Sequence, residues 1–482
     1  MHTTNDGFGK KNHLWSKIND WRPDDPSFWN AKTRKVANRN LLFSVVNLVT
    51  AFCVWLMWSG LVVYLKETRP DLSTQQFYWL TAIPMFSAGF LRIGYSFVIP
   101  NIMGGKSWTM VSSAIFIPFL LWTYLRIDNP TTSFFELSIL ALSCGLAGAN
   151  FASSCANISY FYPKKFKGLA LGINAAIGNL GVGLIQFLTP ILVLTQFGVF
   201  SGEGTMLSTG SKVFLKNVPL ALIIPAFVGV ILSYFFMNNI HCVGNGIKSQ
   251  LLVLKNRHTW FMSFLYTATF GSFIGFAAVF PILLSSEFPG SPSESWAFLG
   301  AVLSSLMRPL AHIICLKYDS VKLTNWSFLL MICGLMGAAF SLSSENLPGS
   351  FWIFLISYLG IFIGTGLGKG STTHMIPEIF HSINKDQSLA SRDTASVIGF
   401  TSSIATIGAF FMPQVYMLGI TFFGGIKAAL YFFVACYALC IFVNWLLYQR
   451  HYEENPLLSH IGKSLAAEAS DEDKAVEDGK VA

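Results

Sequence analysis

The chain has 482 residues, of which 53% are hydrophobic and only 12% are charged, and its mean hydropathy is +0.53. Soluble domains carry roughly 25% charged residues, so this composition excludes the water-soluble fold classes and indicates a polytopic membrane protein. The formal net charge of +8 is spread over short loops, which argues against a nucleic-acid partner and makes the lipid bilayer the expected environment.

Twelve apolar segments are long enough to cross a bilayer, since a spanning helix needs about 20 apolar residues. The longest polar stretch in the middle of the chain separates the sixth segment from the seventh. We therefore predict an all-α integral membrane protein with twelve transmembrane helices in two pseudo-symmetric six-helix halves. The predicted helices cover residues 40–65, 77–99, 108–126, 133–161, 168–197, 218–237, 259–283, 296–316, 325–343, 351–376, 394–421 and 428–448.

The predicted domain organisation has five parts. A polar cytoplasmic segment at 1–39 precedes the N-terminal half at 40–237, and it lacks the apolar core of a signal peptide, so we expect it to be retained. A central cytoplasmic loop at 238–258 leads to the C-terminal half at 259–448. The last part, at 449–482, is acidic and polar, which is typical of a disordered tail.

Lysine and arginine counts predict the orientation in the membrane. With the N-terminus inside, the short inner loops hold eleven of these residues and the outer loops hold six, and the N-terminal segment adds eight more on the inner side. Cytoplasmic loops carry an excess of Lys and Arg. We therefore predict that both termini are cytoplasmic.

Two arginines lie deep within apolar helices. Arg92 is in the second predicted helix and Arg308 is in the eighth, which is the second helix of the second half. A charge at the bilayer centre costs at least ~2.5–3.5 kcal/mol, and no carboxylate lies near enough in sequence to neutralise either one. Two planar guanidinium forks at similar depth suit a small trigonal anion between two repeats. The sequence therefore predicts an anion substrate, while capping by backbone carbonyls and snorkelling to water are the structural alternatives.

Glycines recur at helical spacing in three of the predicted helices. They can provide static close packing, or smooth surfaces on which helices slide during alternating access, and the sequence leaves both interpretations open. In membranes, small residues let helix backbones approach closely. The glycines that we assign to gating or helix packing are Gly145, Gly148, Gly178, Gly181, Gly366, Gly368 and Gly370.

Titratable groups are scarce within the predicted helices. No Asp or Glu falls at midplane depth, because Glu136 and Glu378 lie near helix ends. The remaining candidates for proton coupling are His312 and His374, although a membrane histidine is more often a hydrogen-bonding group between helices. A third intramembrane cation, Lys369, either lines the inner vestibule and attracts anions or snorkels inward.

Neither a cofactor nor a metal site is predicted. The eight cysteines lack paired spacing and lie mostly in apolar segments, where we expect them to act as small buried residues. No metal-spaced histidine cluster or arrangement of nucleophile and base appears, so we expect a transporter rather than an enzyme. A transporter-like sensor is disfavoured because no segment is long enough for an output domain.

Several of these motifs together resemble the nitrate/nitrite porters of the major facilitator superfamily, the NarK-like proteins. The resemblance covers most of the chain, from Asp20–Pro23 to the last predicted helix, and its strongest stretch is Gly145–Gly183. The sequence motifs that carry it are Ala147–Ser154, Ala156–Ser159, Gly178–Gly181, Gly366–Thr372, Leu91–Arg92 with Tyr95–Phe97, and Tyr266–Phe276.

The resemblance implies a twelve-helix transporter of the bacterial inner membrane that moves nitrate and nitrite. By position, Arg92 and Arg308 would clamp the anion, and further hydrogen bonds and packing against its faces would come from four more residues. Asn179 and Tyr266 would donate those hydrogen bonds, while Phe151 and Phe270 would pack the faces.

The chain departs from the family pattern near these positions. Ala175 and Ala176 replace two glycines, Lys369 replaces a small serine, Thr373 replaces an aromatic residue, and Pro309 and His312 replace small residues. The arginine pair is intact. We expect a monomer that works by alternating access, and the absence of a midplane carboxylate favours nitrate/nitrite exchange. The alternatives are nitrate/proton symport and a porter for another small anion such as formate.

Overall fold

The structure, a computed structural model, describes residues 17–207, 210–240, 251–291, 295–343, 350–383 and 387–450. Most of the predicted tail at 449–482, much of the central loop at 238–258 and the first sixteen residues lie outside the described residues. The described chain is almost entirely helical, which confirms the predicted all-α class.

Within residues 17–207 and 210–240, the structure describes nine helices: α1 (Ala31–Thr68), α2 (Thr74–Asn101), α3 (Gly105–Ile115), α4 (Ile117–Arg126), α5 (Phe134–Ser143), α6 (Gly145–Gly148), α7 (Asn150–Phe161), α8 (Lys164–Leu194) and α9 (Asn217–Phe236). Short turns and strands lie in the connections: β1 (Lys17–Ile18), η1 (Gly198–Ser201), β2 (Thr205–Met206), β3 (Lys212–Val213) and β4 (Asn239–Ile240). Strand β1 pairs in parallel with β4, and β2 pairs antiparallel with β3.

Among the described residues from 251 to 450, the first element described in full is the short turn η2 (Leu252–Lys255), and two of the elements are π-helical turns. The described elements that follow it are α11 (Arg257–Tyr266), the π-helical turn η3 (Thr267–Gly271), α12 (Ser272–Glu287), α13 (Phe298–Cys315), α14 (Ser320–Ser343), α15 (Ser350–Ile383), α16 (Gln387–Phe423), α17 (Lys427–Asn444) and the π-helical turn η5 (Trp445–Gln449).

Each of the twelve predicted membrane helices coincides with a helix or with a run of consecutive helices. Within the described residues, eleven of these segments are long and apolar enough to cross a membrane. The twelfth is α2, whose 28 residues extend ~42 Å at 1.5 Å per residue, more than the ~30 Å hydrocarbon core. The pattern of apolar runs therefore predicted the number and order of the helices correctly.

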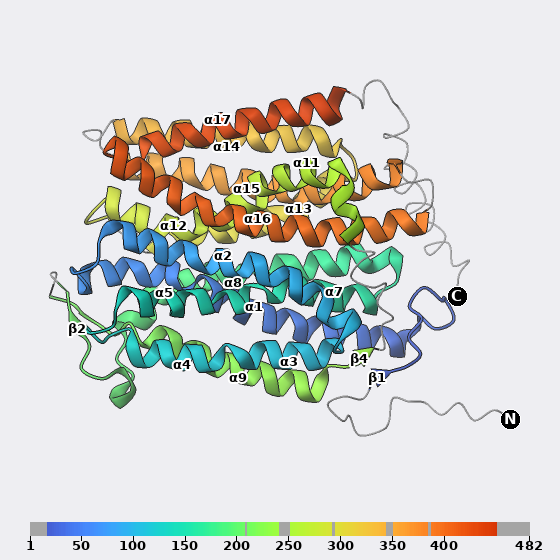
Figure 1. Cartoon of the computed structure of the whole chain (residues 1–482), viewed down its shortest axis with the longest axis horizontal. Helices are drawn as coiled ribbons and strands as arrows, with labels where there is room; N and C mark the ends of the chain where they lie inside the picture. The colour runs from blue at the N-terminus through green and yellow to red at the C-terminus, as the bar shows by residue number, and fades with distance from the viewer. Residues whose placement is uncertain are drawn as a thin grey trace. The chain divides into compact units, whose positions relative to one another are not determined.

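The chain divides into two compact units. Unit 1 draws on Met1–Ser249, Ile274–Val302 and Thr406–Met417, and unit 2 draws on Gln250–Phe273, Leu303–Ala405 and Leu418–Ala482. Within unit 1, α1 packs against α8 and α9, and α3 packs beside α9 (Figure 1). Within unit 2, α14 packs against both α15 and α17 (Figure 1).

The segment before α1 is folded onto the ends of other helices in unit 1. The indole Nε1 of Trp21 donates to the carbonyl of Phe161 at 3.3 Å, and the carboxylate of Asp24 accepts from the amide of Lys164 at 2.8 Å. Asp24 thereby satisfies one of the free N–H groups in the first turn of α8. The helix α1 starts at Ala31, before the predicted position 40, because Asn30 forms a capping box with Thr33.

Two predicted membrane helices are interrupted. The span predicted at 133–161 is divided into α5, α6 and α7 by breaks at Cys144 and Ala149. At both breaks the hydrogen bonds shorten to three residues, from Cys144 N to Ala141 O and from Ala152 N to Ala149 O, each 3.1 Å. The span predicted at 108–126 is divided at Phe116, two residues before Pro118, whose nitrogen has no hydrogen to donate.

Candidate functional site

In unit 1, Arg92 lies in α2 with its guanidinium fully buried. Both Nε and Nη2 donate to the carbonyl oxygen of Gly148 at 3.1 Å, and Nη1 donates to Oγ1 of Thr406 at 2.6 Å. The guanidinium carbon lies 4.9 Å from the ring centroid of Trp55 and 5.1 Å from that of Phe151. A buried cation beside aromatic rings is stabilised by the ring quadrupoles. Hydrogen bonds and aromatic contacts within unit 1 thus both stabilise the charge of Arg92.

The interrupted helix explains why Gly148 can bind Arg92. In a regular helix the carbonyl of Gly148 would accept from the amide of Ala152, but that amide donates to Ala149 instead. The carbonyl is therefore available to the guanidinium. Gly148 also has to be a glycine, since a Cβ atom there would lie 2.6 Å from the indole ring of Trp55. Capping by a backbone carbonyl, one of the structural alternatives for the buried arginines, thus applies to Arg92.

Of the other two predicted substrate-binding residues in unit 1, Phe151 contacts Arg92 and Asn179 is hydrogen-bonded within its own helix. Phe151 is buried and contacts Arg92, as described above. Asn179 is fully buried in α8, where its amide nitrogen donates to the carbonyl of Ala175 in the same helix. Its Oδ1 has no hydrogen-bond partner among the described residues. The structure thus brings Phe151 to Arg92, while the amide nitrogen of Asn179 is engaged within its own helix.

In unit 2, Arg308 lies in α13 and is 6% exposed. Its Nε, Nη1 and Nη2 atoms have no hydrogen-bond partner within the part of the chain that the structure describes. The guanidinium carbon lies 4.3 Å from the ring centroid of Phe273 and 5.7 Å from that of Phe270. An unsatisfied buried charge is costly. Arg308 therefore differs from Arg92 in having guanidinium donors that no described residue satisfies.

Aromatic residues lie within and next to a π-helical turn near Arg308. Tyr266 ends α11 and Phe270 lies in η3, and their ring centroids are 5.7 Å apart. The hydroxyl of Tyr266 is buried and has no hydrogen-bond partner among the described residues. Lys369 of α15 joins the group, with Nζ 3.8 Å from the Tyr266 centroid and 4.6 Å from that of Phe270. Single π turns inside helices are frequent at functional sites.

The seven predicted glycines all lie where helices approach closely. A Cβ atom at Gly178 would lie 2.5 Å from Leu48, one at Gly368 would lie 2.6 Å from Thr269, and one at Gly370 would lie 2.9 Å from the carbonyl of Arg308. The remaining sites are equally crowded, with contacts to Ser87 at Gly145, Trp55 at Gly148, Val49 at Gly181 and Ser304 at Gly366. Such contacts require close packing, and a sliding role for these surfaces stays a prediction.

The two predicted histidines are neighbours in unit 2. The ring centroids of His312 on α13 and His374 on α15 are 5.5 Å apart. His374 Nδ1 lies 3.0 Å from Oε1 of Glu378, and Oε2 of the same carboxylate accepts a hydrogen bond from the hydroxyl of Ser320 at 2.5 Å. Lys369 and His374 are thus on the same helix but have different partners.

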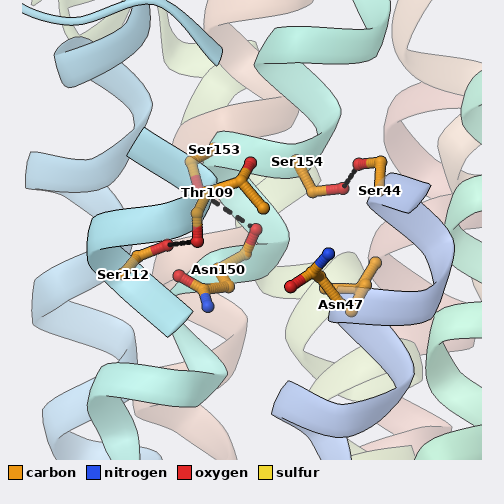
Figure 2. A pocket seen from close by; sticks show the side chains of 8 residues that line it. Ser44, Asn47, Thr109, Ser112, Asn150, Ser153 and Ser154 are labelled. Atoms are coloured by element: carbon orange, nitrogen blue, oxygen red, sulfur yellow. Dashed lines mark hydrogen bonds between the residues drawn. The ribbon is translucent and has the colours of Figure 1, made fainter. Parts of the chain in front are cut away.

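A small polar pocket lies between α1, α3 and α7 in unit 1 (Figure 2). Hydroxyl and amide groups line it, and Ser44 and Ser154 face each other with their oxygens 2.8 Å apart (Figure 2). The side-chain oxygen of Asn150 is buried and has no partner among the described residues. The lining residues are Ser44, Asn47, Leu48, Thr109, Ser112, Asn150, Ser153 and Ser154.

Comparison with known proteins places the chain in a family. The model of the Major Facilitator Superfamily matches residues 46–413. The chain belongs to the major facilitator superfamily. Among similar proteins, the nitrate/nitrite transporter NarU of Salmonella typhimurium is 38% identical over 446 residues, which are 90% of this chain and 96% of NarU. The probable nitrate/nitrite antiporter NarK2 of Thermus thermophilus is 32% identical, over 91% of this chain and 98% of that protein.

Solved structures agree on the fold. The crystal structure of a D-xylose-proton symporter has a TM-score of 0.64 and 13% identity, covering 85% of this chain and 97% of that one. At that identity the likeness supports the fold of a major-facilitator transporter alone. The comparisons confirm the resemblance to the nitrate/nitrite porters of this superfamily, and they confirm a membrane transporter rather than an enzyme.

Sequence reasoning missed several residues of this major-facilitator protein that contact the arginines. Trp55, Phe273 and Thr406 lie on other helices from the arginines that they contact. Thr406 is 314 residues away from Arg92 in the chain, so no local pattern could connect the two. Phe273 lies in an aromatic-rich segment of α12, but its contact with Arg308 can be recognised only once the fold places this residue beside α13.

Proposed function

We propose that this protein transports nitrate and nitrite across the membrane by alternating access, exchanging one anion for the other, and that Arg92 and Arg308 bind the anion. The proposal includes a bacterial inner-membrane location, cytoplasmic termini, a monomer and the predicted division into two six-helix halves. The names of relatives at 38% and 32% identity support the substrates, and the second name supports the exchange.

The observation that carries the proposal is the guanidinium of Arg308, buried and without a hydrogen-bond partner among the described residues. Hydrogen bonds to charged groups contribute about 1.5–3 kcal/mol each, so a bound anion gains most where the protein satisfies the cation least. The planar fork can donate two parallel hydrogen bonds to a planar oxyanion. The ring of Phe270 lies beside the guanidinium of Arg308, and the buried hydroxyl of Tyr266, which has no partner among the described residues, is a further donor that suits a weakly hydrated anion.

Counterflow into proteoliposomes tests this function. Vesicles loaded with nitrite are given labelled nitrate outside, and the uptake is compared with that of empty vesicles with and without an inward proton gradient. We expect uptake that requires internal nitrite and is not reduced by excess formate. Nitrate uptake that needs no internal nitrite and is driven by the proton gradient would establish symport instead. Effective competition by formate would identify a different substrate.

A variant links the transport to the proposed residue. Arg308→Lys keeps the charge but removes the fork, so we expect nitrate kcat/KM to fall by about 10- to 100-fold, the equivalent of one charge-assisted hydrogen bond. Arg257→Lys, at the start of α11, serves as the matched control and should leave uptake unchanged. Wild-type transport by the Arg308→Lys protein would refute the assigned role.

A further inference from the structure

Helices α13 and α15 of unit 2 run side by side in register, with contacts repeating every four residues. A Cβ atom at Gly366 would lie 3.0 Å from the Cα atom of Ser304, and one at Gly370 would lie 2.9 Å from the carbonyl oxygen of Arg308. The next step along both helices brings His312 to His374, with ring centroids 5.5 Å apart. The two glycines therefore allow the backbone approach that places the histidines together, one helical turn from the anion-binding arginine.

His374 belongs to a hydrogen-bonded group, and the ring of His312 lies beside it. His374 Nδ1 lies 3.0 Å from Glu378, and Ser320 at the start of α14 donates to the other carboxylate oxygen at 2.5 Å. The side chains of His374 and Glu378 are each 18% exposed, while His312 is exposed. An imidazole hydrogen-bonded to a carboxylate, with a second imidazole beside it, is a group that can bind and release a proton.

Other charged groups of unit 2 set the field at this cluster. Arg308 precedes His312 by one turn of α13, and Lys369 precedes His374 on α15. Asp319 precedes α14, and burial raises the pKa of its carboxyl, with a further upward contribution from the charge of Glu378. Further titratable groups on these elements and on α11 and α16 are Cys315 on α13, Lys322 and Cys333 on α14, Tyr358 and His381 on α15, Arg257, His258 and Tyr266 on α11, and Arg392, Asp393 and Tyr416 on α16.

We propose that His312, His374 and Glu378 form a proton-binding site that is thermodynamically linked to the anion at Arg308. The inference rests on the proposed function and deepens it by naming a second ligand, the proton. When no anion is bound, the positive charge of Arg308 opposes a second positive charge on the imidazole one turn away. A bound anion neutralises Arg308, so the cluster then binds its proton more tightly.

Linkage is reciprocal, so protonation of the cluster must also raise the affinity for the anion by the same factor. The proton goes onto a ring nitrogen of the histidine pair, where the carboxylate of Glu378 stabilises the resulting imidazolium. The sign follows from the charges. Anion affinity increases as the pH falls through the titration of the cluster, and anion binding takes up protons from solution.

Proton uptake can be measured directly on the purified full-length protein. Neutralised sodium nitrate is added near pH 6.5 to protein in weakly buffered detergent solution with a pH-indicating dye, and sodium gluconate provides the salt control. We expect alkalinisation with nitrate alone. Apparent nitrate affinity should be about fivefold or more tighter at pH 5.5 than at pH 7.5, the lower end of typical coupling strengths.

Matched variants assign the proton to the cluster. His312→Gln/His374→Gln should abolish the alkalinisation and flatten the pH dependence, whereas His258→Gln, on α11 beside Tyr448, should keep both. Nitrate-induced thermal stabilisation of each variant confirms that it is folded and binds the anion. If the double variant does not fold, Glu378→Gln replaces it, and the midpoint of its pH dependence should shift to lower pH.

The outcomes separate the two proposals. Nitrate binding by the wild type without proton uptake, or proton uptake that persists in the double variant, would overturn the linked site and leave the transport function standing. No nitrate binding by the wild type at any pH would overturn the proposed function itself. Proton uptake with nitrate that is lost only in the cluster variants supports the inference.

Discussion

The two buried arginines should contribute very differently to the stability of the empty protein. Arg92 donates to the carbonyl of Gly148 and to the hydroxyl of Thr406, whereas Arg308 has no acceptor among the described residues. Replacing each arginine by lysine keeps the positive charge and removes the planar fork. The exchange therefore tests hydrogen bonding rather than charge.

The magnitude follows from the acceptors that lysine cannot reach. A single ammonium at position 92 lacks the two separate edges by which the guanidinium reaches Gly148 and Thr406, so we expect it to keep one of these contacts. A charge-assisted hydrogen bond contributes about 1.5–3 kcal/mol, so Arg92→Lys should lower the free energy of unfolding by that amount. Arg308→Lys breaks no protein hydrogen bond that the structure describes, and its stability should stay within about 0.5 kcal/mol of the wild type.

The assay is denaturant unfolding in detergent, followed by tryptophan fluorescence in nitrate-free buffer. Added nitrate should then stabilise the wild type more than Arg308→Lys, because the variant binds the anion more weakly. The reasoning would be refuted if Arg308→Lys lost as much stability as Arg92→Lys in the absence of nitrate. It would also be refuted if Arg92→Lys unfolded at the same denaturant concentration as the wild type.

Three further predictions concern packing, capping and charge in unit 1. Gly178→Ala should lower the free energy of unfolding by about 1–3 kcal/mol through overpacking. Gly172→Ala, on the same helix but with open space where its Cβ would lie, should not lower it. Equal denaturant midpoints for the two variants would contradict the close packing at Gly178. Asp24→Ala should cost about 0.5–2 kcal/mol by removing the cap of α8, and an unchanged denaturant midpoint would show that the cap is dispensable. The hydrogen bond from Arg69 lowers the pKa of Asp71 below 3.8, so its stabilisation is present above that pH and is lost as the pH falls further. Thermal midpoints of the wild type and Asp71→Asn should therefore differ at pH 7 and converge below pH 3.8.

The sequence was sufficient to predict the number and order of the membrane-spanning segments and the all-α class. Each bilayer crossing needs a continuous apolar run, and such runs are conspicuous in a chain whose loops are short and charged. Helix interruptions were not predictable in the same way. The breaks at Cys144 and Ala149 and the π-helical turn at Thr267–Gly271 keep the apolar character of the segment and change only its backbone hydrogen bonds.

The candidate site shows the same division. Burial of Arg92 and Arg308 followed from their apolar surroundings, and both arginines are buried in the structure. Their partners did not follow, because the contacts to Thr406 and Phe273 come from helices distant in sequence. The proximity of Lys369 to Tyr266 likewise depends on how α15 packs against α11 and η3, which no local pattern records.

Equivalent positions in two repeats do not require equivalent roles. Both arginines occupy the second helix of a predicted half, yet the carbonyl released by a helix break compensates Arg92 while the guanidinium of Arg308 lies beside aromatic rings and donates no hydrogen bond to a described residue. An anion that binds Arg92 has to compete with bonds that the protein already makes, so it gains less there. At Arg308 it supplies hydrogen bonds that the described protein does not, so the free energy of anion binding should depend more on Arg308.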